Sequence, residues 1–362
     1  MPTRAPRNRA TGRPERGAKE TMMTTTMQRS AGKGEAAKAG LSVIVPVYNE
    51  GAGLARLHGE IVEALRGLRD TRGLAGEIVY VDDGSADNSL VTARGLPAHG
   101  VDVQVIALSR NFGKEAALMA GLDHARRGAV LFMDADGQHP PALIATLVGH
   151  WLDGGYDVVY TAKATRANEP ALRRLAGRAF YALINWGARQ KIPEDAGDFR
   201  LLSPRATAAL RQLPERNRFF KGLASWIGFR QLRVDYAPAE RTHGQTSWSY
   251  AGLVGLSVEG LTSFSVAPLR IASLLGMLLA ASALLFGGWM LIEAFVYERT
   301  VPGYPSLIVG LMVIGGVQLL MIGVMGEYIG KILSEIKARP VYFVAEHSVK
   351  AADDDANRAA AE

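Results

Sequence analysis

The sequence predicts an α/β protein, in which a mostly parallel sheet with helices on both faces is followed by two membrane-spanning helices. Between residues 41 and 133, short apolar runs alternate with longer helical patterns, which is typical of a doubly wound sheet. Acidic and turn residues follow these runs, at the sheet edge where such folds bind ligands. Near the C-terminus, two uncharged stretches are long enough to cross a bilayer.

The predicted elements of the first half follow one another in a regular order. Leu41–Val45 reads as a strand, and we expect Pro46 to stop it because proline has no N–H to donate. A helix over residues 53–69 follows, and then the strand Glu77–Val81. The remaining predicted elements are the strand Val103–Leu108, the helix Glu115–Arg126 and the strand Ala129–Met133.

The predicted sheet has no glycine-rich fingerprint after its first strand and no phosphate-binding Walker lysine. A nucleotide site must therefore be built from other residues. Pro46–Glu50 and Asp82–Asp83 end neighbouring strands, so the Tyr48 ring could stack on a base while the carboxylates accept its N–H or bind ribose hydroxyls. The alternative is that Asp83 begins an ordinary turn that caps a helix.

Asp134 and Asp136 come directly after the fourth predicted strand, and Pro140 and Pro141 prevent its continuation. Mg²⁺ and Mn²⁺ are hard cations, which suit one or two protein carboxylates together with substrate phosphate oxygens. The alternative is an acidic turn that merely caps the next helix. The chain has no cysteine and no zinc-type histidine spacing, which excludes disulfides and thiolate chemistry.

The N-terminal segment is expected to be disordered, because it combines charge with few large aliphatic residues. Residues 1–40 hold nine Lys or Arg and three Glu, so their charge of +6 equals that of the whole chain. Nucleic-acid binding is therefore not indicated. The segment could meet an anionic membrane surface or simply remain solvated.

Two segments are expected to span a membrane as a helical hairpin. Ile271–Ile292 holds twenty-two uncharged residues, and twenty-seven more lie between Arg299 and Glu327. Lysine and arginine residues flank the outer ends of the pair, which predicts that both ends are cytoplasmic. The glycines of the spans could allow helix contact within one subunit or in a homo-oligomer.

Residues before the first span have an amphipathic pattern that predicts a helix lying in the membrane interface. The whole chain then divides into five regions. These are a tail (1–40), a cytoplasmic α/β domain (41–245), interfacial helices (246–268), two spans (269–330, with helices at about 271–295 and 305–327) and a cytoplasmic C-terminal tail (331–362).

The strand end Pro46–Glu50, the turn Val81–Ser85 and the Asp134-Ala135-Asp136 turn together resemble a family 2 glycosyltransferase of GT-A fold, which has a Rossmann-like sheet. Further segments resemble polyprenyl-phosphate glycosyltransferases, and among them the bactoprenol (undecaprenyl-phosphate) glucosyltransferases. These segments are Leu108–Glu115, Asp195–Leu202, Pro214–Phe219, Gly326–Lys331 and Lys337–Pro340. The resemblance extends over about residues 41–345. Gly137 and His139 depart from it, since relatives often carry Leu and Asp there.

The resemblance implies metal-dependent, inverting transfer of a sugar to a polyprenyl phosphate at the cytoplasmic face of the cell membrane, with UDP-glucose as the favoured donor. The implied ligands of Mg²⁺ or Mn²⁺ are Asp134, Asp136 and Gln138. The implied nucleotide-sugar residues are Pro46, Tyr48, Asn49, Glu50, Asp82, Asp83, Asn111, Gly113, Lys114, Asp134, Ala135 and Asp136. The implied catalytic residues are Asp198, Arg200, Arg241 and Lys163.

We expect Arg200 and Arg241 to bind the acceptor phosphate, because guanidinium groups hold two phosphate oxygens at once. Lys163 is a weaker candidate for that role. Asp198 could orient sugar hydroxyls, pair with Arg200 or act as a base, and the first two roles are favoured. Three alternative functions remain. The first is a GDP-mannose-dependent enzyme like dolichol-phosphate mannose synthase, and the second is a non-catalytic nucleotide-sugar-binding protein. The third is a processive polysaccharide synthase, which would carry a Gln-x-x-Arg-Trp sequence that is absent here.

Overall fold

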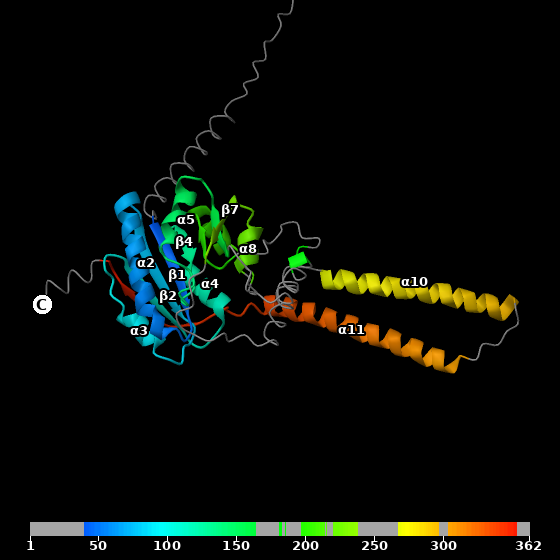
Figure 1. Ribbon diagram of the computed structural model, residues 1–362. Helices are drawn as coiled ribbons and strands as arrows, with labels where there is room; N and C mark the ends of the chain where they lie inside the picture. Colours follow the sequence, from blue (N-terminus) through cyan, green and yellow to red (C-terminus); the bar gives the residue numbers. More distant parts are fainter. Residues whose placement is uncertain are drawn as a thin grey trace, which may run out of the picture.

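The computed structural model of the protein consists of an α/β domain and a long helical hairpin that projects from it (Figure 1). It describes residues 40–163, 181–182, 185, 197–213, 215, 220–237, 267–296 and 303–352. The predicted N-terminal tail, Arg241 and nearly all of the predicted interfacial segment lie outside these residues.

The described strands form one sheet whose order is β7-β5-β6-β4-β1-β2-β3-β8. β1 pairs in parallel with β2 and β4, and β2 pairs in parallel with β3, while β6 and β8 run antiparallel to their neighbours. The strands are β1 Gly40–Val47, β2 Ala75–Asp82, β3 Asp102–Leu108, β4 Ala129–Phe132, β5 Val158–Lys163, β6 Arg200–Leu202, β7 Gln231–Tyr236 and β8 Val344–Lys350. The predicted α/β fold with a mostly parallel sheet is confirmed.

Helices cover both faces of this sheet because its strands are apolar on both sides. Val43 and Val45 of β1 pack on the face covered by α2 and α5, whereas Ile44 faces the side covered by α4, α7 and α8. On that second side, a Cβ atom added to Gly121 of α4 would lie 2.3 Å from the Ile44 side chain, so a larger residue would push the helix off the sheet. The helices of the domain are α2 Gly51–Arg72, α3 Ser89–Gly95, α4 Lys114–His124, α5 Leu143–Leu152, α7 Pro204–Arg211 and α8 Phe220–Trp226.

The first strand differs from its prediction, because β1 continues through Pro46 to Val47. Pro46 pairs with Val81 of β2, but the ladder with β4 ends at Ile44. Pro46 therefore lies where β1 has a partner on one side only, and a missing N–H is tolerated at such a position.

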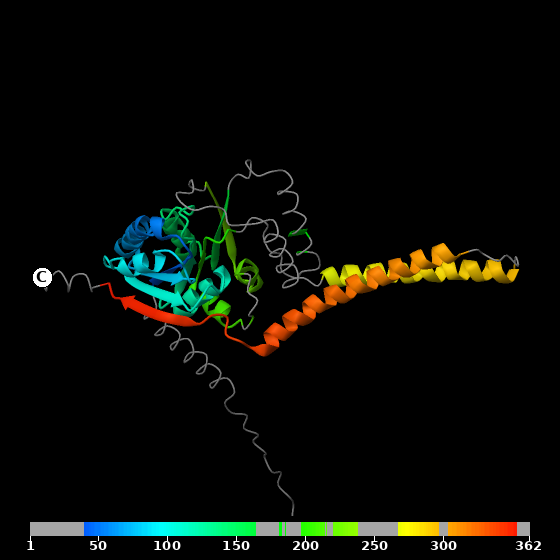
Figure 2. The same cartoon turned by 90° about the horizontal axis from the view of Figure 1, so that it is seen from below.

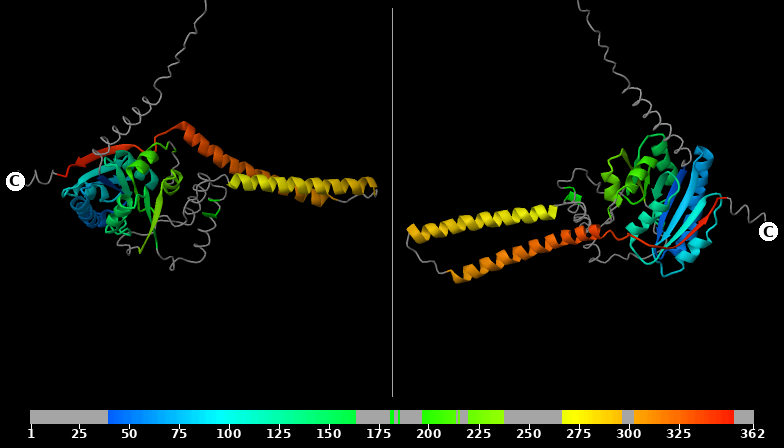
Figure 3. Two further views of the ribbon diagram at one scale, coloured as in Figure 1. Left: turned by 90° about the horizontal axis from the view of Figure 1, so that it is seen from above. Right: turned by 180° about the vertical axis from the view of Figure 1, so that it is seen from behind.

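The predicted C-terminal tail needs a correction. α11 continues to Lys337, and Val344–Lys350 then forms β8, which pairs with β3 as the last strand of the sheet (Figures 2 and 3). Lys350 also donates from Nζ to the carbonyl oxygens of Arg94 and Leu96, at 2.6 and 2.7 Å. Without β8, the edge of β3 would expose unpaired backbone groups. The chain therefore returns from the hairpin and completes the sheet.

The hairpin consists of α10 (Ala267–Val296) and α11 (Tyr304–Lys337). Within them, Pro268–Trp289 and Gly310–Lys337 are long and apolar enough to cross a membrane, by length and composition. Many of the described leucine, isoleucine and methionine side chains of both helices are exposed. The helices contact each other near Gly276, where an added Cβ would lie 3.7 Å from the sulfur atom of Met321.

Candidate active site

The loops that follow β1, β2, β3 and β4 meet at the carboxyl edge of the sheet, as the sequence predicts. Asn49 links the first two of these loops. Its backbone N–H donates to Ser85 Oγ at 3.0 Å, and its Oδ1 accepts from the Ala86 N–H at 2.8 Å. Asn49 adopts a left-handed φ of 57°, which asparagine tolerates better than most residues. The Asn49 amide therefore holds the loops together.

The neighbours of Asn49 have different roles. The Glu50 N–H donates to Ser89 Oγ at 2.9 Å, which joins the start of α2 to the start of α3. The Tyr48 side chain is 50% exposed and offers a ring face to a ligand. Tyr48 and Asn49 are both exposed at this edge, and Tyr48 is the one of the two with an aromatic ring.

Asp82 and Asp83 are adjacent and buried, but their oxygen atoms are used differently. Asp83 accepts from the Phe112 N–H at 2.7 Å and from the Gly113 N–H at 2.9 Å, so both of its oxygens hold the loop after β3. Burial raises the pKa of Asp83. Asp82 Oδ2 accepts from the Ser85 N–H at 3.2 Å, whereas its buried Oδ1 has no hydrogen-bond partner within the described part of the chain. A buried oxygen without a donor requires an explanation, and at the ligand-binding edge of the sheet this oxygen is available to a donor from a ligand.

The glycines at this edge allow the two loops to come together. Gly84 has a φ of 70°, and a Cβ there would lie 2.6 Å from the Asn111 backbone nitrogen. Gly113 has a φ of 97° and precedes the first residue of α4, Lys114. Since Asp83 fixes the Gly113 N–H, it also fixes the point from which the Lys114 side chain starts.

Four charged side chains from separate elements meet at the centre of the site. Lys114 Nζ lies 2.6 Å from Asp134 Oδ1 and 2.7 Å from Asp198 Oδ2, and Lys221 Nζ of α8 lies 3.1 Å from Asp198 Oδ1. We call Lys114, Asp134, Asp198 and Lys221 the Lys114 cluster. Lys221 was not among the predicted site residues, because no local spacing connects it with Asp198.

The ion pairs of the Lys114 cluster favour the charged forms of Lys114 and Asp198. Burial opposes the charge of Lys114, but the carboxylates of Asp198 and Asp134 outweigh it and raise the pKa of the ammonium group. Likewise, Lys221 and Lys114 overcome the effect of burial and hold the pKa of Asp198 below its usual range. A carboxylate with so low a pKa is a weak proton acceptor. Of the roles expected for Asp198, orientation therefore fits the geometry better than action as a base, although its charged partners are lysines and not Arg200.

Arg200 lies beneath this cluster and not on its surface. The residue is only 3% exposed, and its guanidinium group donates to the carbonyl oxygens of Gly197 at 3.2 Å and Phe220 at 3.4 Å. Glu115 accepts from the Phe220 N–H at 3.2 Å, and burial, reinforced by Asp198, raises its pKa to about 7. These hydrogen bonds connect the segments around Gly197 and Phe220 below the site. The expected contact of Arg200 with the acceptor phosphate therefore stays a prediction.

Lys163 and Arg241 are the two remaining basic residues that the sequence predicts for the site. Lys163 is the last residue of β5, where its backbone is paired with that of Tyr236 on β7. Arg241 lies outside the described residues, so its role also stays a prediction.

The acidic turn after β4 is shaped by its neighbours. Gly137 has a φ of 73°, which would strain a leucine, and the Gln138 N–H donates to Asp136 Oδ1 at 3.0 Å. His139 is 6% exposed, accepts the Asp134 N–H on Nδ1 at 3.2 Å and stacks on Phe199 with ring centroids 5.1 Å apart. Both departures from the family pattern thus support the turn.

The donor set of this turn fits a hard divalent cation that shares its coordination with a ligand. Asp134 and Asp136 offer carboxylate oxygens, and the Asp134 side chain is 25% exposed. No group of three or more His, Cys, Asp or Glu residues in the described part of the chain could enclose a metal ion. Mg²⁺ commonly binds through one or two carboxylates and completes its shell with water and phosphate oxygens, so the turn suits that mode of binding.

Comparisons with known proteins agree with this site. A family profile described as Glycosyl transferase family 2 matches residues 42–210. The SfII prophage-derived bactoprenol glucosyl transferase of Shigella flexneri is 40% identical over 304 residues, which are 84% of this chain and 97% of that protein. The uncharacterized glycosyltransferase sll0501 of Synechocystis is 40% identical over 306 residues, with 84% and 95% covered.

The fold, the site and these relatives together define a glycosyltransferase. The chain belongs to glycosyl transferase family 2, since it is similar to such relatives over nearly their whole length. Solved structures are more remote. Glucosyl-3-phosphoglycerate synthase from Mycobacterium tuberculosis, in complex with Mn²⁺, UDP-glucose and phosphoglyceric acid, is 22% identical with a TM-score of 0.42, over 64% of this chain and 81% of that one. Likeness at this level does not inform the site.

Proposed function

We propose that the protein transfers glucose from UDP-glucose to a polyprenyl phosphate at the cytoplasmic face of a membrane, with a divalent cation. The observation that carries the proposal is the Lys114 cluster beside Asp136, which puts carboxylates for a cation next to ammonium groups for phosphates. Relatives covered over 97–99% of their length, from Shigella flexneri and from Shigella phage SfV, are named bactoprenol glucosyl transferases, which supports this choice of sugar and acceptor.

The donor base is bound between the first two loops. Asp82 Oδ1 is a buried acceptor without a partner in the described part of the chain, and it suits a ring N–H of a base. Tyr48 supplies an exposed ring for stacking. Uracil and guanine both carry such an N–H, so the glucosyl names of the relatives, and not Asp82, favour UDP-glucose over the alternative donor GDP-mannose.

The reaction is a single displacement at the anomeric carbon. An oxygen of the acceptor phosphate forms the new bond while the bond to the nucleoside diphosphate breaks, so the configuration inverts. Asp134, Asp136 and Gln138 would hold Mg²⁺ or Mn²⁺, which would supply positive charge against the leaving diphosphate. The acceptor is already anionic and needs no strong base, which agrees with the low pKa of Asp198. Lys114 and Lys221 provide N–H donors that reduce repulsion between the two phosphate-bearing substrates.

The membrane hairpin brings the lipid acceptor to this site. β8 follows α11 and pairs with β3 of the α/β domain, which supports a topology with both ends of the hairpin on the same side of the membrane. The lysine and arginine residues outside the spans make that side the cytoplasmic one. The wild-type chain has no cysteine, so a Pro302→Cys variant can be labelled in inverted vesicles. Labelling of that cysteine by an impermeant reagent from the cytoplasmic side would contradict the topology.

The function is tested with the full chain in detergent, undecaprenyl phosphate and Mg²⁺. Radiolabelled UDP-glucose and GDP-mannose are supplied separately, and label in the lipid fraction is measured. We expect glucose transfer that stops on addition of EDTA. Transfer from GDP-mannose alone would assign the alternative donor, and nucleotide-sugar binding without any lipid product would contradict the acceptor.

A further inference from the structure

Lys114 uses the same carboxylate that a divalent cation requires. Its Nζ atom lies 2.6 Å from Asp134 Oδ1, within the range of a strong charge-assisted hydrogen bond. An ammonium group in this position repels a second cation and occupies one of the oxygens that would bind it. Entry of a cation at Asp134 must therefore weaken or break the contact with Lys114.

The structure also provides a second position for the displaced ammonium group. Lys114 Nζ lies 2.7 Å from Asp198 Oδ2, so it can leave Asp134 and keep one carboxylate partner. Lys221 holds the other oxygen of Asp198 at 3.1 Å and fixes the direction of that carboxylate. The backbone of Lys114 is held independently, through the contact of Gly113 with Asp83. The side chain can thus move while the loop and helix stay in place.

Binding of a cation also changes the net charge of the site, and this affects how the site binds phosphate groups. Asp134, Asp136 and Asp198 together with Lys114 and Lys221 have a net charge of −1, which a divalent cation changes to +1. The site then attracts phosphate groups instead of repelling them. An ammonium group has three N–H donors, so Lys114 has a donor for a phosphate oxygen once it leaves Asp134.

We propose that Lys114 is an internal competitor for the metal ion at Asp134, and that loading of the ion releases its ammonium group toward the substrate phosphates. Lys114 thereby makes phosphate binding follow metal binding. This inference rests on the proposed metal-dependent function and deepens it, because it assigns the order in which cation and phosphate enter the same site.

The test measures binding of Mn²⁺ alone to the purified full chain, from the electron paramagnetic resonance signal of free Mn²⁺. Lys114→Met should bind Mn²⁺ about fivefold more tightly than the wild type, because an ion pair between partly exposed groups contributes up to about 1 kcal/mol. The same variant should lose transfer activity. Tighter metal binding with lower activity distinguishes a competitor from a residue that merely supports the site, whose loss would weaken both.

Lys221→Met is the matched control. It removes the same charge and also contacts Asp198, but Lys221 has no ion pair with Asp134. Its Mn²⁺ affinity should rise less than that of Lys114→Met, since Lys221 contacts Asp198 and does not occupy an oxygen of Asp134. Lys114→Gln replaces Lys114→Met if circular dichroism shows that the methionine variant does not fold. Equal affinities in the Lys114 and Lys221 variants would overturn the competition while leaving the metal site intact. A wild-type chain that does not bind Mn²⁺ would overturn the metal dependence itself.

Discussion

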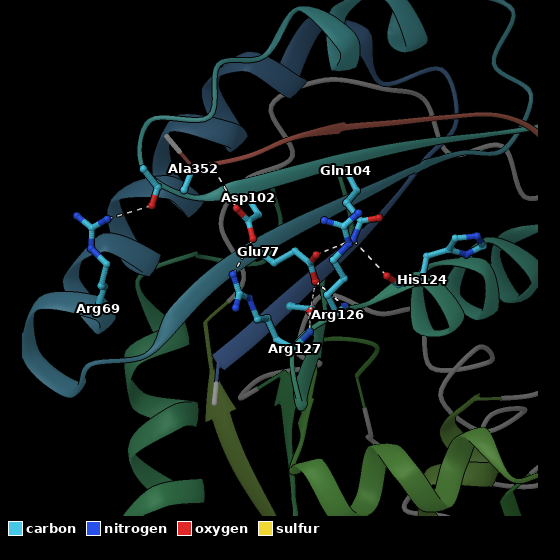
Figure 4. A network of polar contacts seen from close by, with 10 residues as sticks. Arg69, Glu77, Asp102, Gln104, His124, Arg126, Arg127 and Ala352 are labelled. Atoms are coloured by element: carbon cyan, nitrogen blue, oxygen red, sulfur yellow. Dashed lines mark hydrogen bonds and ion pairs between the residues drawn. The ribbon is translucent and has the colours of Figure 1, made fainter. Parts of the chain in front are cut away.

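Two polar clusters lie at the sheet, one near the amino ends of β1, β2 and β3 and one at the carboxyl edge, and they differ in how completely their polar atoms are hydrogen-bonded. At one end, Glu77 is fully buried and accepts hydrogen bonds from Ser42 Oγ, the Arg126 N–H and Gln104 Nε2 (Figure 4). Gln104 in turn accepts from His347 of β8 at 2.7 Å. We call these residues the Glu77 network. At the carboxyl edge, the Lys114 cluster has side chains that are 25–41% exposed.

The two clusters differ in their role: the Glu77 network stabilises the fold, and the Lys114 cluster is available for activity. Each Glu77 oxygen has a donor, and buried polar groups that are satisfied in this way fix one arrangement of the chain. The Lys114 cluster instead exposes charged groups, and nearby Asp82 Oδ1 has no donor in the described residues. Incomplete satisfaction at an open edge is what a site needs in order to gain partners from its substrates. Four sets of variants test whether the two clusters are separate in this way.

The largest effect is expected from the acidic turn. Asp134→Asn and Asp136→Asn should each reduce transfer about 10²–10³-fold, because they remove charge that stabilises the leaving diphosphate through the cation. The melting temperature should hardly change, since neither side chain belongs to the core. Asp70→Asn, at an exposed side chain of α2, is the control. Near-normal turnover by both variants in saturating Mg²⁺ would remove these aspartates from the mechanism.

In the Glu77 network we expect a substitution to lower stability and to leave transfer activity unchanged. Glu77→Gln has one acceptor oxygen where the wild type has two, so at least one donor among Ser42, Gln104 and Arg126 is left unpaired. Leaving such a buried group unsatisfied costs about 1–3 kcal/mol of unfolding free energy, measured by chemical denaturation. Transfer by the folded protein should stay near the wild-type level. Glu63→Gln, on the exposed side of α2, should change neither quantity, and a selective loss of activity in Glu77→Gln would contradict the division between the two clusters.

Asp82 and Asp83 allow the same comparison within two adjacent residues. In each, Asn leaves one acceptor oxygen for two donors. In Asp82→Asn the lost contact is with the donor nucleotide or Ser85, so we expect UDP-glucose affinity to fall about tenfold with little change in melting temperature. In Asp83→Asn the lost contact is with the Phe112 or Gly113 N–H, so the melting temperature should fall as well. Calorimetric titration with UDP-glucose and thermal unfolding measure the two effects. Equal changes in both variants would contradict the separate roles.

The sequence could predict the strands and the acidic turn because both depend on local patterns. Apolar runs bounded by Pro and Asp mark β1, β2 and β4. It could not predict that Lys114 meets Asp198, because 84 positions separate them and only the folded sheet brings them together. Nor did it predict β8, which lacks a buried apolar face: most of its residues are exposed, and pairing with β3 is what makes it a strand. The different uses of Asp82 and Asp83 likewise depend on which backbone N–H groups each one reaches.

The smallest effect is expected where β8 meets the Glu77 network. Gln104 Oε1 accepts from His347 Nε2, so that ring nitrogen carries a proton. Burial, together with His124 and Arg126, lowers the pKa of His347 in the folded protein, and Glu77 only partly offsets this. A lowered pKa means that protonation favours the state in which β8 is released. The stabilising contribution of His347 is therefore complete above its unfolded pKa of about 6.5 and is lost as the pH falls through the folded value.

Hydrogen exchange of residues 344–350, expressed as protection factors, should show weaker protection at pH 5.5 than at pH 7.5. The change should correspond to less than about 1 kcal/mol, because His347 is largely exposed and solvent screens its charge. His347→Gln keeps an N–H donor for Gln104 without a titrating ring, so its protection should not vary with pH in this range. His150→Gln on α5 is the control and should behave as the wild type. If protection of β8 in the wild type is the same at both pH values, His347 does not couple β8 to the network.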